Sequence, residues 1–143
     1  EVLVIFTTPY FWEMSLQKEI AVQANGSPDA KYIAFLRTHL PNRQRSAITH
    51  IAEVEYTESN VPRMSMLKGL SSSIKKDFRH HMKLRGTDIS GTHKQYVFKK
   101  GSIKKLIRPI EHYGPGPMIK FRTTMSKLLL ANTTRDLLHQ RDK

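Results

Sequence analysis

The segment 47–57 alternates apolar and polar side chains more regularly than any other part of the chain. One face of the strand expected there carries Ile48, His50, Ala52, Val54 and Tyr56. A period of two residues is typical of a half-buried β-strand and does not fit a helix. A strand also needs neighbours that complete its backbone hydrogen bonds. The segment therefore predicts a β-sheet with one face in the core.

Other stretches have the length and composition of short strands: residues 2–8, 31–38, 94–100 and 102–110. Residues 16–24 and 118–122 could form further strands. Short turn-forming segments separate most of them, so the chain is expected to contain about six strands. Strands outnumber helices, and sheet edges must be hidden. We therefore predict an α+β fold in which a curled sheet, or small pseudo-barrel, carries helices on its outside.

Residues 63–84 change to a helical period. The apolar side chains there, which recur every three or four residues, are Leu67, Leu70, Ile74, Phe78 and Met82. They form one stripe about 120° wide at roughly 100° per residue. This predicts a helix over residues 63–84, interrupted near Gly69.

Two short helices are expected near the C-terminus. Thr123 or Thr124 can cap the first, with Met125, Leu128 and Leu129 facing inward. Asn132 or Thr133 can cap the second, where Asp136 is placed in the first turn.

The charge is distributed unevenly along the chain. Residues 1–58 carry five basic and seven acidic side chains, whereas residues 59–143 carry 19 basic and five acidic ones. Such an asymmetry is typical of proteins that bind polyanions, although a basic surface without a ligand is the alternative. The residues expected to contact phosphate are Lys75, Lys76, Arg79, Lys83, Arg85, Lys99 and Lys100.

The composition excludes several classes of site. The sequence has no cysteine, and no pair of its seven histidines has the spacing of a helical zinc motif. We therefore expect no metal, no cofactor and no self-contained catalytic site.

The absence of cysteine fits the cytoplasm, where we expect the protein. No apolar run is long enough for a membrane span. The apolar stripe of residues 67–82 is needed for the core, so we also expect no binding to a membrane surface. A length of 143 residues fits a single domain, residues 1–143. Because the chain begins at Glu1 without a methionine, we expect this domain to be excised from a larger protein.

Two groups of side chains are candidates for reading a base. Tyr10 and Trp12 follow the first strand, and each combines a ring with a polar group; a core role for Trp12 is the alternative. His50 lies on the apolar face of the best strand, where it either completes the core or contacts a ligand. Arg37 and Thr38 end the preceding strand and are expected at the same rim.

Residues 32–38 followed by 47–54, with the run Ile51-Ala52-Glu53, resemble the central strand pair of the PUA-like superfamily, which includes PUA, ASCH, EVE and YTH domains. Residues 121–132 resemble the end of such modules at the N-terminus of McrB-like restriction proteins. The resemblance implies a pseudo-barrel that binds nucleic acid, often with one base turned out into an aromatic pocket.

We therefore expect a reader module for DNA, or alternatively RNA, that recognises a flipped or modified base. As part of a restriction or defence protein it would work with fused or associated motor or nuclease subunits. An ASCH-type nuclease or nucleotide hydrolase and a basic protein-interaction module are the alternatives.

Overall fold

The computed structural model describes residues 1–38, 40, 46–112 and 121–138. The elements in chain order are β1 (Val2–Thr7), α1 (Pro9–Lys18), β2 (Ile20–Gln23), β3 (Tyr32–Arg37), β4 (Ala47–Pro62), the 3₁₀ helix η1 (Arg63–Leu67), α2 (Ser72–Leu84), β5 (Thr92–Phe98), β6 (Lys104–Glu111), β7 (Phe121–Thr123), α3 (Met125–Leu130) and α4 (Thr134–Leu138).

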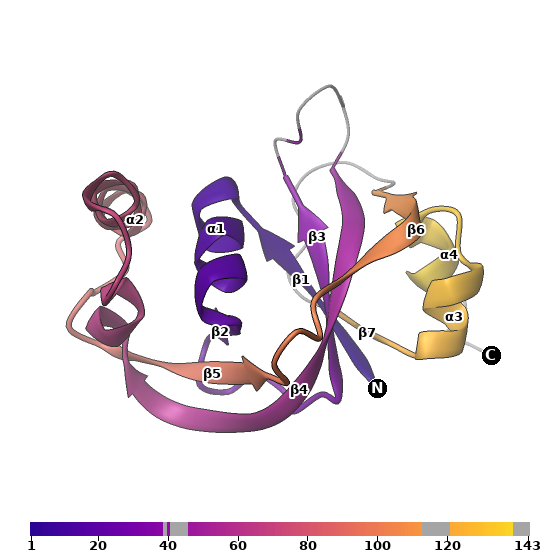
Figure 1. Cartoon of the computed structure of the whole chain (residues 1–143), viewed down its shortest axis with the longest axis horizontal. Coiled ribbons are helices and arrows are strands. Elements are labelled where there is room, and N and C mark those ends of the chain that lie inside the picture. The colour runs from indigo at the N-terminus through magenta and orange to yellow at the C-terminus, as the bar shows by residue number, and fades with distance from the viewer. Residues whose placement is uncertain (39, 41–45, 113–120, 139–143) are drawn as a thin grey trace.

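The strands form one curled sheet with the order β2-β5-β4-β3-β1-β7, and β6 pairs with β4 outside this path. β1 and β3 run parallel, whereas the other pairs are antiparallel. Helices α1 and α2 lie on one side of the sheet, and α3 and α4 lie on the opposite side (Figure 1). The predicted α+β class with a curled sheet and outer helices is confirmed, with seven strands described rather than about six.

β4 is the strand that joins the two parts of the sheet. Its first half pairs with β3 and β6, and its second half pairs with β5. A β-bulge interrupts its register, because Phe35 pairs with His50 whereas Leu36 pairs with Ile48. The prediction that Ile48 shares a face with His50 and Ala52 is therefore wrong. The extra residue, Thr49, reverses the alternation at this point.

The segment after β1 differs from the prediction. Residues 16–24 were expected to form a strand, but α1 occupies Pro9–Lys18 and β2 covers only Ile20–Gln23. Pro9 fits the start of the helix, because its fixed φ angle and missing N–H suit the first turn. Glu19 ends the helix in the left-handed conformation, with φ of 55°. Burial of Trp12, Met14 and Ser15 against neighbouring elements overrides the strand-like composition.

The helical stripe of residues 63–84 is divided, as predicted, near Gly69. Gly69 has a φ angle of +79°, a conformation that glycine adopts more easily than residues with a side chain. It separates η1 from α2. Ser71 caps α2 by accepting a hydrogen bond from the Ile74 N–H at 3.2 Å. Phe78 and Met82 are buried against α1, which confirms the predicted apolar face.

The C-terminal helices follow their predicted capping signals. Thr124 accepts a hydrogen bond from the Lys127 N–H, and Asp136 accepts one from the Thr133 N–H at 3.1 Å. Leu128 is buried as expected, but Leu129 is 62% exposed, so its predicted inward position is wrong. One residue step turns a helix by about 100°, which carries Leu129 away from the sheet. The expected strand 118–122 is observed as β7, and residues 118–120 lie outside the described residues.

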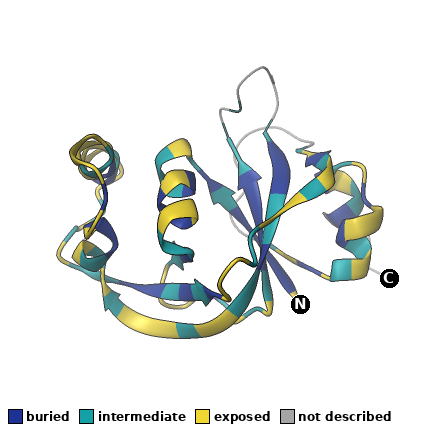
Figure 2. Cartoon of the chain, in the orientation of Figure 1, coloured by how far each residue is buried: buried dark blue, intermediate teal, exposed yellow. Residues whose placement is uncertain are grey.

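Three apolar clusters stabilise the described part of the chain. One lies between the sheet and α3 and α4, one lies inside the curl of the sheet, and one joins α1, η1 and α2. Figure 2 shows that buried residues are concentrated in β1, β3 and the first half of β4, where the sheet is covered on both sides.

Phe78→Ala is expected to lower the free energy of unfolding by about 3–5 kcal/mol, because the Phe78 side chain is fully buried and contacts Tyr10 and Phe11. Leu84→Ala in the same helix is the control. That side chain is 74% exposed, so a change below about 0.5 kcal/mol is expected. Urea unfolding of the two variants measures both values, and equal losses would contradict the packing described for α2.

Candidate nucleic-acid interface

Helix α2 presents a continuous basic face beside its buried stripe. At about 100° per residue, Lys75, Arg79, Lys83 and Lys76 fall within roughly 100° of one another. We call these four residues the α2 basic face. Lys76, Arg79 and Lys83 are exposed and Lys75 is half-buried. Lys75, Arg79 and Lys83 are spaced four residues apart, where like charges repel.

No carboxylate in the described part of the chain forms an ion pair with the α2 basic face; the pairs observed there are Lys94–Asp29, Lys99–Glu53 and Arg122–Glu1. Asp77 lies on the same helix, turned by about 160° from Lys75 and Arg79 and by about 100° from Lys76. The four cations therefore keep their full positive field toward solvent.

The predicted phosphate contacts Lys99 and Lys100 lie apart from α2. They follow the end of β5, whereas α2 connects to the start of that strand, about 20 Å away along seven residues. Lys99 Nζ is 2.5 Å from Glu53 Oε2, and this pairing raises the pKa of Lys99. The structure therefore divides the predicted phosphate-binding residues into two separate groups, and Lys99 already has a partner.

Arg85 follows the α2 basic face directly and caps the helix. Burial raises the pKa of Tyr10, and the charge of Arg85 opposes this change. Burial lowers the pKa of His81, and the charge of Arg85 lowers it further. Arg85 also lines the space between α1 and α2. It therefore lies at the C-terminal end of α2 on the side where α1 and α2 pack together.

Trp12, Arg37 and His50 come together as predicted, from α1, β3 and β4. The Trp12 and His50 ring centroids are 4.6 Å apart, and Arg37 Cζ lies 4.5 Å from the Trp12 ring. Trp12 is only 5% exposed and also contacts Phe35 edge-on. Thr38 continues the same edge, where its N–H donates to the Thr7 carbonyl at 3.1 Å. The Trp12 ring is thus covered in this structure.

Burial and the nearby charges of Arg37 and Lys105 lower the pKa of His50. The Thr49 hydroxyl lies 2.8 Å from His50 Nδ1, so one ring nitrogen has a hydrogen-bond partner. Burial also lowers the pKa of Arg37, and Glu13 opposes this change. The three-residue cluster therefore favours a neutral imidazole beside a charged guanidinium.

Tyr10 does not join this cluster. It lies on the opposite face of α1, and its hydroxyl is 2.6 Å from His81 Nδ1. The Tyr10 ring also packs edge-on against Phe78. The single pocket expected from Tyr10, Trp12 and His50 is therefore not assembled. His81 was not among the predicted site residues, although its position three residues after Phe78 places it beside the buried stripe.

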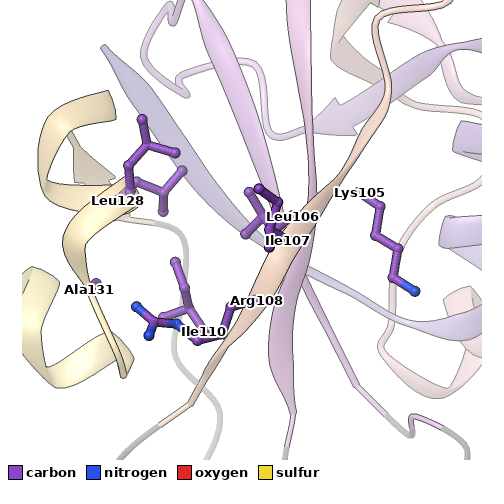
Figure 3. Close-up of a pocket in the computed structure, with 8 residues that line it drawn as sticks. Lys105, Leu106, Ile107, Arg108, Ile110, Leu128 and Ala131 are labelled. Carbon is purple, nitrogen blue, oxygen red and sulfur yellow. The ribbon is translucent and has the colours of Figure 1, made fainter.

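An apolar groove between β6 and α3 was also not predicted. Its volume is about 510 Å³, and Figure 3 shows Leu128 of α3 facing Leu106 and Ile110 of β6. Lys105 and Arg108 also line the groove, and Ile107 is fully exposed. The pairing of β6 with β4 is irregular between Ile48 and His50, which exposes this part of β6.

The described residues contain no group of three histidine or acidic side chains that could hold a metal ion. None of the described helices is both long and apolar enough to cross a membrane.

The described residues form an α+β fold in which a curled mixed sheet has helices on both sides. A crystal structure of a mutant of ZmASCH from Zymomonas mobilis has this fold, with a TM-score of 0.54 and 16% sequence identity over 87% of this chain and 89% of that chain. The predicted PUA-like fold is confirmed, and the match is to an ASCH protein rather than to an EVE or YTH domain. No family model and no curated protein matches the sequence.

The free energy of unfolding is expected to fall as the pH drops through 6.5. Burial lowers the pKa of His50, His81 and His93 below the usual 6.5, so the unfolded chain takes up these protons first. This stabilisation is fully present above pH 6.5 and is lost as the pH falls toward the folded-state pKa values. Urea unfolding between pH 7 and 5 measures the loss.

The carboxylate of Asp29 is an internal control, because its protonation should not contribute to the loss of stability between pH 7 and 5. Hydrogen bonding to Lys94 lowers the pKa of Asp29 below 3.8, so its stabilisation is lost only at more acidic pH. His50→Gln is expected to reduce the slope between pH 7 and 5. An unchanged slope in this variant, together with an NMR titration of the His50 ring centred at or above pH 6.5, would contradict the assignment.

Proposed function

We propose that this chain binds nucleic acid, with the α2 basic face in contact with the phosphate backbone. The observation that carries the proposal is a set of four neighbouring cations with no ion-paired carboxylate among the described residues. The i,i+4 spacing of Lys75, Arg79 and Lys83 costs free energy in the unbound protein. A row of phosphates would relieve that repulsion and release condensed counterions.

The fold supports this proposal. PUA-like domains, which the sequence resembles, use a curled sheet with outer helices to present one face to a nucleic acid. Helix α2 is an insertion between β4 and β5, and it stands at the far end of the molecule from α3 and α4 (Figure 1). It therefore offers its basic face to a strand or duplex without disturbing the sheet.

The more specific part of the proposal is a reader of a flipped or modified base in DNA, within a restriction or defence protein, that does not catalyse a reaction itself. The run Ile51-Ala52-Glu53 and the grouping of Trp12, Arg37 and His50 support it. Because the Trp12 ring is covered, base stacking there requires Arg37 to move away from the indole.

The triple variant Lys76→Gln, Arg79→Gln and Lys83→Gln is expected to weaken binding to a duplex or single strand at least tenfold at 100 mM salt. Loss of about three phosphate contacts should also reduce the slope of log K against log salt concentration by two to three, at roughly 0.7–0.9 for each contact. Fluorescence anisotropy across a salt series measures both quantities.

The matched control is Lys104→Gln, Lys105→Gln and Arg108→Gln, which removes the same number of lysines and arginines from exposed positions on β6. Its salt slope should remain close to that of the unaltered protein. Equal losses in both triple variants would show that only net charge matters and would refute the α2 assignment. Metal-dependent cleavage of the strand by the same preparation would instead favour the nuclease alternative.

A further inference from the structure

We propose that the space between α1 and α2 binds one nucleoside phosphate, either a free mononucleotide or a single nucleotide unit of a bound strand. This inference rests on the proposed function and gives it a specific pocket. Two adjoining hollows of about 310 and 170 Å³ occupy this space, and both are lined by Phe11, Val22, Gln23, His81 and Arg85. We call them together the α1–α2 cavity. Its size suits a mononucleotide.

The α1–α2 cavity is lined by cationic and imidazole side chains and by no carboxylate among the described residues. Arg63 and Arg85 both reach it, together with His81 and His93. Two guanidinium groups provide planar donors that match phosphate oxygens. Their two full charges exceed the partial negative charge of about one half at the C-terminus of α2.

Arg63 is held in place by the turn before β5. Its N–H donates to the Gly91 carbonyl at 2.9 Å, and its Nη1 donates to the Asp88 carbonyl at 2.8 Å. A Cβ at position 91 would collide with Arg63 Nη1. The absence of a side chain at Gly91 therefore leaves room for the Arg63 guanidinium. The Asp88 carboxylate is engaged by Ser90 and does not line the cavity.

One buried polar group that lines the cavity lacks a hydrogen-bond partner among the described residues. The hydroxyl of Thr8 is buried and unpartnered, although this residue stands at the N-cap of α1, where its side chain would normally accept an N–H. Native structures rarely leave such a group unsatisfied, and a ligand group could complete it. His93, which is 3% exposed, also lines the cavity; burial lowers its pKa, and a hydrogen bond with the Gln95 side chain opposes that change.

The remaining lining suits a base rather than a simple anion. Phe11, Val22, Met66 and Met82 provide apolar surface, and the Gln23 amide can donate and accept hydrogen bonds. Phe11 is held edge-on by Phe78, with ring centroids 4.6 Å apart. Contact with the Phe11 ring would stabilise any base, whereas the Gln23 amide could distinguish one base from another by hydrogen bonds to the base edge.

Arg85 lies two residues after Lys83, so it is turned by about 160° from Lys83 and lines the α1–α2 cavity. A strand whose phosphates follow Lys76, Arg79 and Lys83 would reach the cavity by bending around the C-terminal end of α2. The Trp12 ring, in contrast, is covered by Arg37.

The test is calorimetric titration of the full chain with 5′-AMP, 5′-CMP, adenosine and inorganic phosphate. At least one mononucleotide should bind tenfold or more tightly than adenosine or phosphate. Arg85→Gln and Arg63→Gln should each reduce that affinity at least tenfold. Arg108→Gln, which removes an exposed arginine elsewhere, should change it less than twofold. Saturating the protein with the mononucleotide that binds should shift the NMR signals of the His81 and His93 rings.

Gly91→Ala provides a second variant that keeps every charge. It should weaken mononucleotide binding, because the added Cβ displaces Arg63. This result can be interpreted even if the arginine substitutions reduce stability. Binding of inorganic phosphate as tightly as of any mononucleotide would refute a nucleoside site. Absence of mononucleotide binding, with strand binding intact, would overturn this inference and leave the α2 interface standing. Absence of strand binding at low salt would instead remove the proposed function on which the inference rests.

Discussion

The whole arrangement depends on the register of β4. This 16-residue strand pairs with β3 and β6 over its first half and with β5 over its second half. The bulge at Thr49 directs Ile48 toward the helices α3 and α4 and turns His50 toward Trp12 inside the curl. Both apolar faces of the sheet are thus filled from one strand, because a single extra residue reverses its alternation.

Elements with strong local signals could be predicted from the sequence. β1, β3 and the divided helical stripe follow from apolar runs, periodicity and the position of Gly69, and the caps of Thr124 and Asp136 follow from side-chain chemistry. Helix α1 could not be predicted, because its aromatic residues favour a strand when considered locally. Its burial against α2 and the sheet decides the outcome, and that depends on contacts distant in sequence.

The same distinction applies to the candidate site. The α2 cations could be identified from their spacing, and the grouping of Trp12, Arg37 and His50 from strand order. In contrast, Tyr10 contacts His81, which lies 71 residues later, and Lys99 pairs with Glu53, which lies 46 residues earlier. Such partners depend on the three-dimensional arrangement of elements that no local pattern specifies. The α1–α2 cavity belongs to this second kind of feature.

The path of the chain around α2 has a consequence for how this protein can diversify. The segment 63–91 leaves the sheet after Pro62 and returns at Thr92, and these two residues are partners across β4 and β5. The segment is therefore a hairpin connection whose ends are already fixed by the ladder. Because the entropy of closing a connection rises only slowly with its length, residues can be added to its exposed turns at small energetic cost. The apolar stripe of the segment must be kept, because Met66, Phe78 and Met82 bury Met14 and Ile20. Chains with the same sheet can thus change their ligand preference through the exposed side chains of this one segment.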